Sequence, residues 1–126
     1  MAVIVDSSTV VDFLHGRSSP ALERAITDAT LVLSPLVIAE ILSGDATPAQ
    51  RELVADLLQE SPVHATPLEH WMNVGALRRI LRTKGLNVTL PDAHVAQCAL
   101  DLDATLLTRD EIFAGIAKHT ALRVLR

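Results

Sequence analysis

The chain has 126 residues, of which 49% are apolar, and this composition excludes a disordered tail or linker. A chain of this length forms one domain, expected here over residues 1–126, and buries roughly two-thirds of its unfolded surface. Fifteen acidic against eleven basic residues give a net charge of −4, which argues against a nucleic-acid binder unless bound cations offset it. With three aromatic residues and no tyrosine, base-stacking platforms of the RRM or OB type are also excluded.

Cysteine content and hydropathy bear on location and assembly. The single cysteine, Cys98, excludes an internal disulfide framework and a cysteine-rich zinc site. The first residues carry no basic segment, and no apolar run reaches the roughly 18 residues of a membrane span, so we expect a cytoplasmic protein without membrane association. A mean hydropathy of +0.33 is high for a soluble monomer and predicts apolar surface that faces a partner, in the simplest case a homodimer.

Apolar runs and capping residues predict alternating strands and helices in chain order. Serine, threonine or proline stands at most of the expected helix starts, and Gly85 is a natural residue to follow a helix end. The predicted strands cover residues 2–5, 31–33, 63–66, 104–107 and 122–125. The predicted helices cover about 7–15, 20–28, 35–44, 48–60, 67–85, 91–102 and 110–117. Short apolar strands separated by helices are typical of a parallel sheet covered on both faces.

Four carboxylates stand in apolar surroundings. Asp6 follows the first strand, and Asp110 lies just beyond the fourth. Glu40 is the only charge between residues 31 and 44, and Asp92 shares a helix face with small apolar residues. Because an isolated buried carboxylate is costly, each needs a partner, and a shared Mg²⁺ or Mn²⁺ would serve several at once. The alternative is structural, because Asp6 and Asp110 would cap helices and Asp92 would suit a helix dipole.

These motifs resemble those of a known family over essentially the whole chain. Val-Asp-Ser-Ser at 5–8, Ala-Glu at 39–40, Pro-Asp-Ala at 91–93 and Leu-Leu-Thr-Arg-Asp at 106–110 are similar to the four acidic motifs of PIN domains. Spacing and size resemble most the VapC-type toxins of toxin–antitoxin pairs. One departure is Ile112, which stands where that family usually has an acid before the phenylalanine, so the fourth acid is placed at Asp110.

The resemblance implies a three-layer α/β fold, with five parallel strands in the order 3-2-1-4-5 flanked by helices. It also implies a Mg²⁺- or Mn²⁺-dependent endoribonuclease that a small VapB-like antitoxin inhibits, with RNA as substrate. Asp6, Glu40, Asp92 and Asp110 would be the catalytic metal ligands. We expect Ser7 and Thr108 to orient a carboxylate or a water, and Arg109 to contact the scissile phosphate. The antitoxin's inhibitory segment would be basic where it meets Asp6 and Asp92.

Other residues receive a structural interpretation. His94 and Cys98 lie four apart on one helix, which allows a shared metal, but we favour a buried cysteine beside a partly exposed histidine. Asp12 is either a fifth acid of the pocket or part of a solvated helix face. Trp71 is expected in the core or a dimer contact. The basic cluster at Arg78, Arg79, Arg82 and Lys84 complements a helix dipole or touches RNA or antitoxin.

Three rival functions remain at this point. A haloacid dehalogenase-like phosphotransferase would need a second aspartate two residues after Asp6, where Ser8 stands. A receiver-like signalling module would need an acid pair near the first strand and a lysine after the fifth, and Lys84 and Lys118 are both misplaced. A PIN scaffold that binds RNA without cleaving it is disfavoured by the intact acidic set, and a cleavage assay decides between the two.

Overall fold

The computed structural model describes all residues from 1 to 126 and contains one parallel sheet. Four strands lie in the order β2-β1-β3-β4: β1 (Val3–Val5), β2 (Leu31–Val32), β3 (Thr105–Leu107) and β4 (Arg123–Leu125). The central strand β1 pairs with β2 and β3, so that Ile4 faces Val32 on one side and Leu106 on the other. The strand ends that carry Asp6 and Thr108 therefore lie at the same edge of the sheet.

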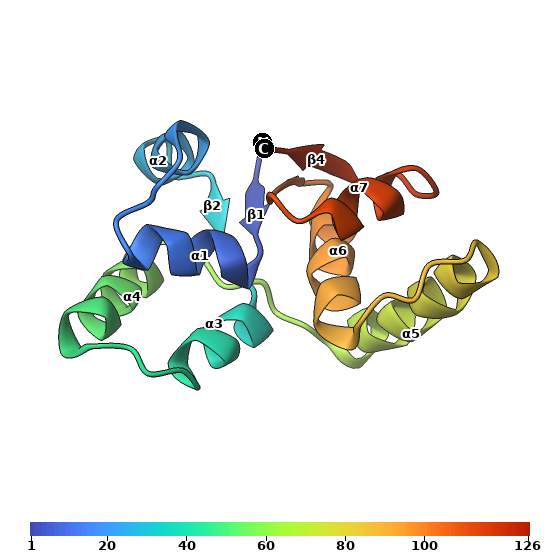
Figure 1. Ribbon diagram of the computed structural model, residues 1–126, viewed down its shortest axis with the longest axis horizontal. Helices are drawn as coiled ribbons and strands as arrows, with labels where there is room; N and C mark the ends of the chain where they lie inside the picture. Colours follow the sequence, from blue (N-terminus) through green and yellow to red (C-terminus); the bar gives the residue numbers. More distant parts are fainter.

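Seven helices surround the sheet (Figure 1). They are α1 (Ser7–Leu14), α2 (Pro20–Thr27), α3 (Pro35–Leu42), α4 (Pro48–Glu60), α5 (Leu68–Thr83), α6 (Leu90–Leu102) and α7 (Glu111–Ala117). In Figure 1, α1 to α4 lie on the β2 side of β1, and α5 to α7 lie on the β3 and β4 side. No helix combines the length and the apolar character that crossing a membrane requires.

The helix starts follow the capping residues expected from the sequence. Ser19, Ser34 and Thr47 each accept a hydrogen bond from a backbone N–H of the first turn, with proline next in the chain. Helix α6 begins at Leu90, one residue earlier than predicted, because Thr89 rather than Leu90 supplies the cap. Gly85 follows the end of α5 with a φ of +81°, a left-handed conformation that glycine adopts without a steric penalty.

The predicted strand at residues 63–66 is wrong, because only one residue of it pairs. Val63 forms a single parallel bridge with Leu33, through Leu33 N–H to the Pro62 carbonyl and His64 N–H to the Leu33 carbonyl, both at 2.9 Å. Leu33 is followed at once by Ser34, the cap of α3, so the neighbouring strand offers no further residue for pairing. The sheet therefore has four strands and a bridge instead of five strands.

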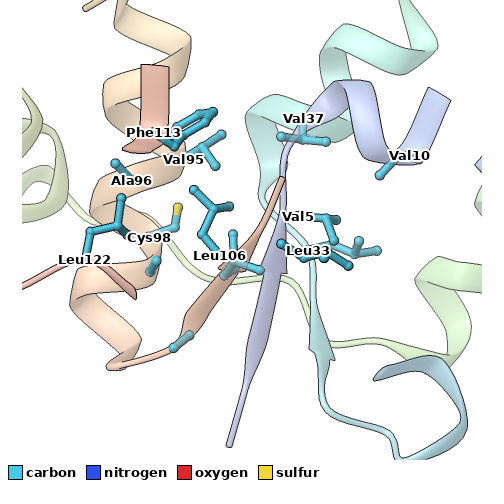
Figure 2. Close-up of a cluster of buried hydrophobic side chains, with 14 of the residues drawn as sticks. Val5, Val10, Leu33, Val37, Val95, Ala96, Cys98, Leu106, Phe113 and Leu122 are labelled. Carbon is cyan, nitrogen blue, oxygen red and sulfur yellow. The ribbon is translucent and has the colours of Figure 1, made fainter. Parts of the chain in front are cut away.

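A single core of 26 buried apolar residues joins the helices to the sheet. Figure 2 shows Leu106 of β3 among side chains of α6 and α7, including Val95 and Phe113. It also shows Val5 beside Val10 of α1 and Val37 of α3. This packing holds α1, α3 and α6 against the strands, and these helices carry or follow three of the four acids singled out in the sequence.

Candidate functional site

Asp6 is held in one orientation at the end of β1. Its side chain is only 5% exposed. Oδ1 accepts hydrogen bonds from the Thr9 backbone N–H at 3.0 Å and the Thr9 hydroxyl at 2.6 Å. Oδ2 accepts from the Ser8 hydroxyl at 3.0 Å and the Thr108 hydroxyl at 2.5 Å. Asp6 is thus the N-cap of α1, as the structural alternative supposed, and both of its oxygens are fixed by neighbours.

Thr108 connects Asp6 to Asp110 at the end of β3. Thr108 is buried, and its hydroxyl donates to Asp6 and accepts from the Asp110 backbone N–H at 3.0 Å. Asp110 in turn caps α7 by accepting the Ile112 N–H at 3.1 Å through Oδ1. One hydroxyl therefore sets the positions of two acidic residues that are 104 residues apart in the chain.

Glu40 and Asp92 meet the other two acids from α3 and α6. Although Glu40 is an exposed residue, partial desolvation of its carboxyl by the surrounding protein raises its pKa above the ordinary value, and the negative charges of Asp92 and Asp6 raise it further. The pKa of Asp92 is also raised, first by burial and then by the charges of Asp110 and Asp6, against a hydrogen bond from Thr89 that lowers it. The charges of Asp6 and Asp92 act on Glu40, and those of Asp6 and Asp110 act on Asp92, so the four carboxylates lie near one edge of the sheet. Figure 1 places α3 and the starts of α1 and α6 together at this edge.

The expectation that these carboxylates are buried is correct only in part. Asp6 is buried and Asp92 is half-buried, whereas Glu40 and Asp110 are exposed. Glu40 does not project from a core-facing side, because Val37 and Ile41 take the buried face of α3. The site therefore combines one fixed, buried aspartate, Asp6, with Glu40 and Asp110, which lie at its solvent-exposed rim. A set of oxygen ligands without sulfur or imidazole, and with like charges that a cation would relieve, fits Mg²⁺ or Mn²⁺.

The residues expected to assist the acids have different outcomes. Thr108 orients Asp6 as predicted, but Ser7 makes no side-chain hydrogen bond, and Ser8 and Thr9 hold the carboxylate instead. The signal for Thr9 was present in the sequence, since the residue three positions after an N-cap normally donates to it. Ser8 carries no comparable signal, because its hydroxyl reaches Asp6 through a local turn of the chain.

Asp12 does not join the four carboxylates. It forms ion pairs with Arg17 at 3.1 Å and Arg109 at 3.8 Å, and it does not contribute to the raised pKa values of Glu40 and Asp92. These groups border a polar pocket next to Asp6, lined by Thr9, Asp12, Arg17, Ser19, Leu107, Thr108, Arg109 and Arg126. Arg109 is exposed there, so its guanidinium is open to a ligand beside the acidic edge.

His94 is fully buried, contrary to the expectation of a partly exposed side chain. It lies against Trp71, whose ring stacks on the imidazole at a centroid distance of 4.7 Å, so Trp71 belongs to the packing around the core. Cys98 is also fully buried, with its sulfur 3.6 Å from Nε2 of His94, and burial raises the pKa of its thiol to about 12. A protonated thiol is a poor nucleophile, so this pair does not form an activated cysteine.

Comparison with known proteins agrees with the fold. The family model described as "PIN domain" matches residues 3–119. The chain belongs to the PIN-domain family. No curated protein matches it in sequence.

Solved VapBC structures share the fold at low sequence identity. A chain of VapBC2 from Rickettsia felis, bound to a promoter DNA fragment, is 20% identical with a TM-score of 0.81, over 99% of this chain and 98% of that one. A chain of DNA-bound VapBC from Salmonella typhimurium is 15% identical with a TM-score of 0.82, over 99% and 97%. A chain of VapBC-1 from nontypeable Haemophilus influenzae is 18% identical with a TM-score of 0.76, over 99% of this chain and 97% of that one. The similarity therefore extends over nearly the whole length of each chain.

Proposed function

We propose that this PIN-domain protein is a Mg²⁺- or Mn²⁺-dependent endoribonuclease and the toxin of a toxin–antitoxin pair. The observation that supports the reaction is the meeting of Asp6, Glu40, Asp92 and Asp110 at one edge of the sheet, with raised pKa values for Glu40 and Asp92. The structures of VapBC complexes that share the fold support the toxin assignment. A cytoplasmic location is part of the same proposal.

In this proposal the four carboxylates hold the cation, directly or through water. The cation would lower the pKa of a bound water and neutralise charge on the phosphate oxygens. Asp6, with all of its hydrogen bonds made inside the protein, serves as the fixed ligand around which the site is built. Glu40 and Asp110, at the solvated rim, are free to adjust when the cation and the RNA arrive.

The basic pocket beside Asp6 suits the RNA backbone. Arg17, Arg109 and Arg126 border it, and phosphate oxygens accept hydrogen bonds from guanidinium groups. Asp12 holds Arg17 and Arg109 in place while leaving their guanidinium groups exposed. The negative net charge therefore does not exclude RNA, because the local charge beside the site is positive and the acids themselves would be neutralised by cations.

The proposal includes two protein partners. A VapB-like antitoxin would place a basic side chain among the four carboxylates, in the position of the cation, and so stop cleavage. Replacing both Asp6 and Asp92 by asparagine should then weaken complex formation as well as activity, and calorimetry would measure the change in affinity. A homodimer would cover apolar side chains that are now exposed on α5 and at the start of α6, such as Leu68, Met72 and Leu90.

The direct test is cleavage of a structured RNA by the purified chain. Mg²⁺ or Mn²⁺ should be required, and Asp6→Asn, Glu40→Gln, Asp92→Asn and Asp110→Asn should each reduce the rate strongly. Asp45→Asn, on an exposed loop after α3, is the matched control and should cleave at the wild-type rate. Cleavage that is independent of divalent cations would contradict the proposed chemistry, and binding of RNA without cleavage would favour the scaffold alternative.

A further inference from the structure

A second cluster of ligand groups lies at the opposite end of α6 from Asp92. His64 follows the bridge at Val63, His70 lies in the first turn of α5, and Asp101 lies in the last turn of α6. Oδ2 of Asp101 is 2.6 Å from Nδ1 of His70 and 3.1 Å from Nε2 of His64. Nine residues of helix, about 14 Å, separate Asp101 from Asp92, so this cluster is distinct from the four carboxylates.

The cluster combines a fixed carboxylate with access to solvent. Oδ1 of Asp101 accepts a hydrogen bond from Gln97 at 2.8 Å. Although burial alone would raise the pKa of Asp101, the hydrogen bonds from Gln97, His70 and His64 outweigh it and hold that pKa below its ordinary value. His64, His70 and Asp101 all line one surface pocket, together with Pro67, Glu69 and Asn73. The carboxylate of Asp101 and the imidazole of His64 are therefore open to an ion and a water molecule, while the buried imidazole of His70 lies directly behind them.

A buried hydrogen-bond chain supports His70 from behind. Nε2 of His70 is 2.8 Å from Nδ1 of His94, and Nε2 of His94 is 2.5 Å from the Ser34 hydroxyl. With a proton on Nδ1 of His70, that group donates to Asp101, His94 donates to His70, and Ser34 donates to His94. With a cation on Nδ1 instead, His70 donates to His94 through Nε2, and His94 donates to Ser34. Every ring nitrogen keeps a partner in both arrangements, and metal-bound histidines normally have such a partner on the second nitrogen.

The two distances from Asp101 to the imidazoles are close to those of a metal site. Zinc binds imidazole nitrogen at about 2.0–2.1 Å and carboxylate oxygen at about 2.0–2.2 Å, so two ligands of a tetrahedral ion lie about 3.3–3.4 Å apart. The separation of Asp101 from His64, 3.1 Å, already approaches this value. The separation from His70, 2.6 Å, must open by about 0.7 Å, which a rotation of the 21% exposed Asp101 side chain allows.

We propose that His64, His70 and Asp101 form a second metal site for a borderline cation such as Zn²⁺, with water from the pocket as a further ligand. Two nitrogen ligands and one carboxylate suit zinc better than Mg²⁺, which prefers oxygen. The ion would tie the chain after the bridge to α5 and α6 and so stabilise this end of the fold. The site does not depend on the proposed nuclease activity.

Cys98 could replace Asp101 as the third ligand, and the experiment must distinguish these two ligand sets. One ligand atom from each of His64, His70 and Cys98 lies within 4.8 Å of the others. The thiol is fully buried and does not line the pocket. Asp101 lines the pocket, and its Oδ2 already lies 2.6 Å from Nδ1 of His70 and 3.1 Å from Nε2 of His64. We therefore assign the third ligand to Asp101.

The test is calorimetric titration of the full chain with Zn²⁺ in excess Mg²⁺, which occupies sites made of oxygen ligands alone. One equivalent should bind and raise the melting temperature. His64→Ala and Asp101→Asn should each weaken binding at least tenfold, since even residues behind a metal ligand contribute about 10- to 100-fold in affinity. His119→Ala removes an exposed histidine elsewhere and should bind as the wild type does. Cys98→Ser should also retain the wild-type affinity.

A Co²⁺ spectrum identifies the ligands directly. The expected spectrum has visible bands of a low-coordinate Co²⁺ and lacks a thiolate charge-transfer band. A thiolate band that disappears in Cys98→Ser would assign the ion to Cys98 and overturn the role of Asp101. Zinc affinity that is unchanged in both His64→Ala and Asp101→Asn would overturn the site altogether. Because Mg²⁺-dependent RNA cleavage is measured separately, either failure leaves the nuclease proposal untouched.

Discussion

Replacement of Thr108 by valine removes one hydroxyl from the centre of the candidate site while keeping the shape of the side chain. In the wild type that hydroxyl donates to Oδ2 of Asp6 at 2.5 Å and accepts from the Asp110 N–H at 3.0 Å. In Thr108→Val both contacts disappear, and Oδ2 of Asp6 keeps only the hydroxyl of Ser8. The variant therefore tests whether this hydroxyl is what positions Asp6.

The magnitude follows from the two lost contacts. A hydrogen bond to a charged group contributes about 1.5–3 kcal/mol, and a backbone N–H left without a partner costs about 1–3 kcal/mol when fully buried. Because water can reach the exposed Asp110, we expect a total near 2–4 kcal/mol. For a chain of this length, about 4 °C per kcal/mol corresponds to a drop in melting temperature of about 8–16 °C. Mg²⁺ affinity should fall by about 10- to 100-fold, as for other residues that orient a metal ligand.

Thr108→Ser is the matched control because it keeps the hydroxyl and loses one methyl group. It should cost about 1 kcal/mol and leave the Mg²⁺ affinity near that of the wild type. Thermal unfolding followed by circular dichroism, with and without Mg²⁺, measures both quantities in each variant. If Thr108→Val melted at the same temperature as Thr108→Ser and bound Mg²⁺ with the same affinity, the hydroxyl would have no role in positioning Asp6.

Three further outcomes are expected. Asp92→Asn should raise the melting temperature of the metal-free protein, since it removes a charge that repels Glu40. It should also abolish most of the rise in melting temperature that Mg²⁺ causes. A lower melting temperature of the metal-free variant would contradict the repulsion. The pKa values of Glu40 and Asp92 are raised above their ordinary values of 4.5 and 3.8. The free energy of unfolding of the metal-free protein should therefore fall as the pH rises from below these ordinary values through the raised ones, and Mg²⁺ should offset that loss. Urea titrations across this pH range measure the change in the free energy of unfolding. Arg109→Ala should raise the KM for RNA cleavage without changing Mg²⁺ affinity, and an unchanged KM would remove Arg109 from the substrate path.

The element order was predictable because local chemistry fixes most of it. Ser19-Pro20, Ser34-Pro35 and Thr47-Pro48 each combine a side-chain cap with a proline in the first turn, and each begins a helix in the structure. The prediction of a strand at 63–66 was wrong because a strand needs a neighbouring strand of matching length to pair with. Residue Leu33 offers only one position before α3 begins, and the sequence of 63–66 does not reveal this.

The four acids attract attention in the sequence because charges are rare within apolar segments, but their burial could not be predicted. Helix periodicity placed Glu40 near Leu36 and Val37 without showing which side of α3 the neighbouring elements cover. The contact of Thr108 with Asp6 depends on strand pairing across 102 residues, and so it follows only from the register of β1 and β3. The side chains that hold Asp6 locally were partly predictable, as Thr9 shows.

The histidine cluster was not predictable from sequence spacing. His94 and Cys98 attracted attention because they are four residues apart, yet the ligand groups that meet are His64, His70 and Asp101, from three separate segments. Asp101 is an ordinary acid at a helix end in the sequence, and only the packing of α5 against α6 brings it to the two imidazoles. Long-range juxtaposition of this kind is a property of tertiary packing and leaves no local pattern.

The proposed nuclease chemistry requires that Asp6, Glu40, Asp92 and Asp110 form one site for a divalent cation. Crystals grown or soaked in Mn²⁺ and measured at the manganese absorption edge would reveal such an ion. An anomalous peak is expected among these four carboxylates, within coordination distance of Asp6, and it should disappear in Asp6→Asn crystals. Manganese that is absent from this edge of the sheet in the wild-type protein, or that remains there in Asp6→Asn, would contradict the proposed site.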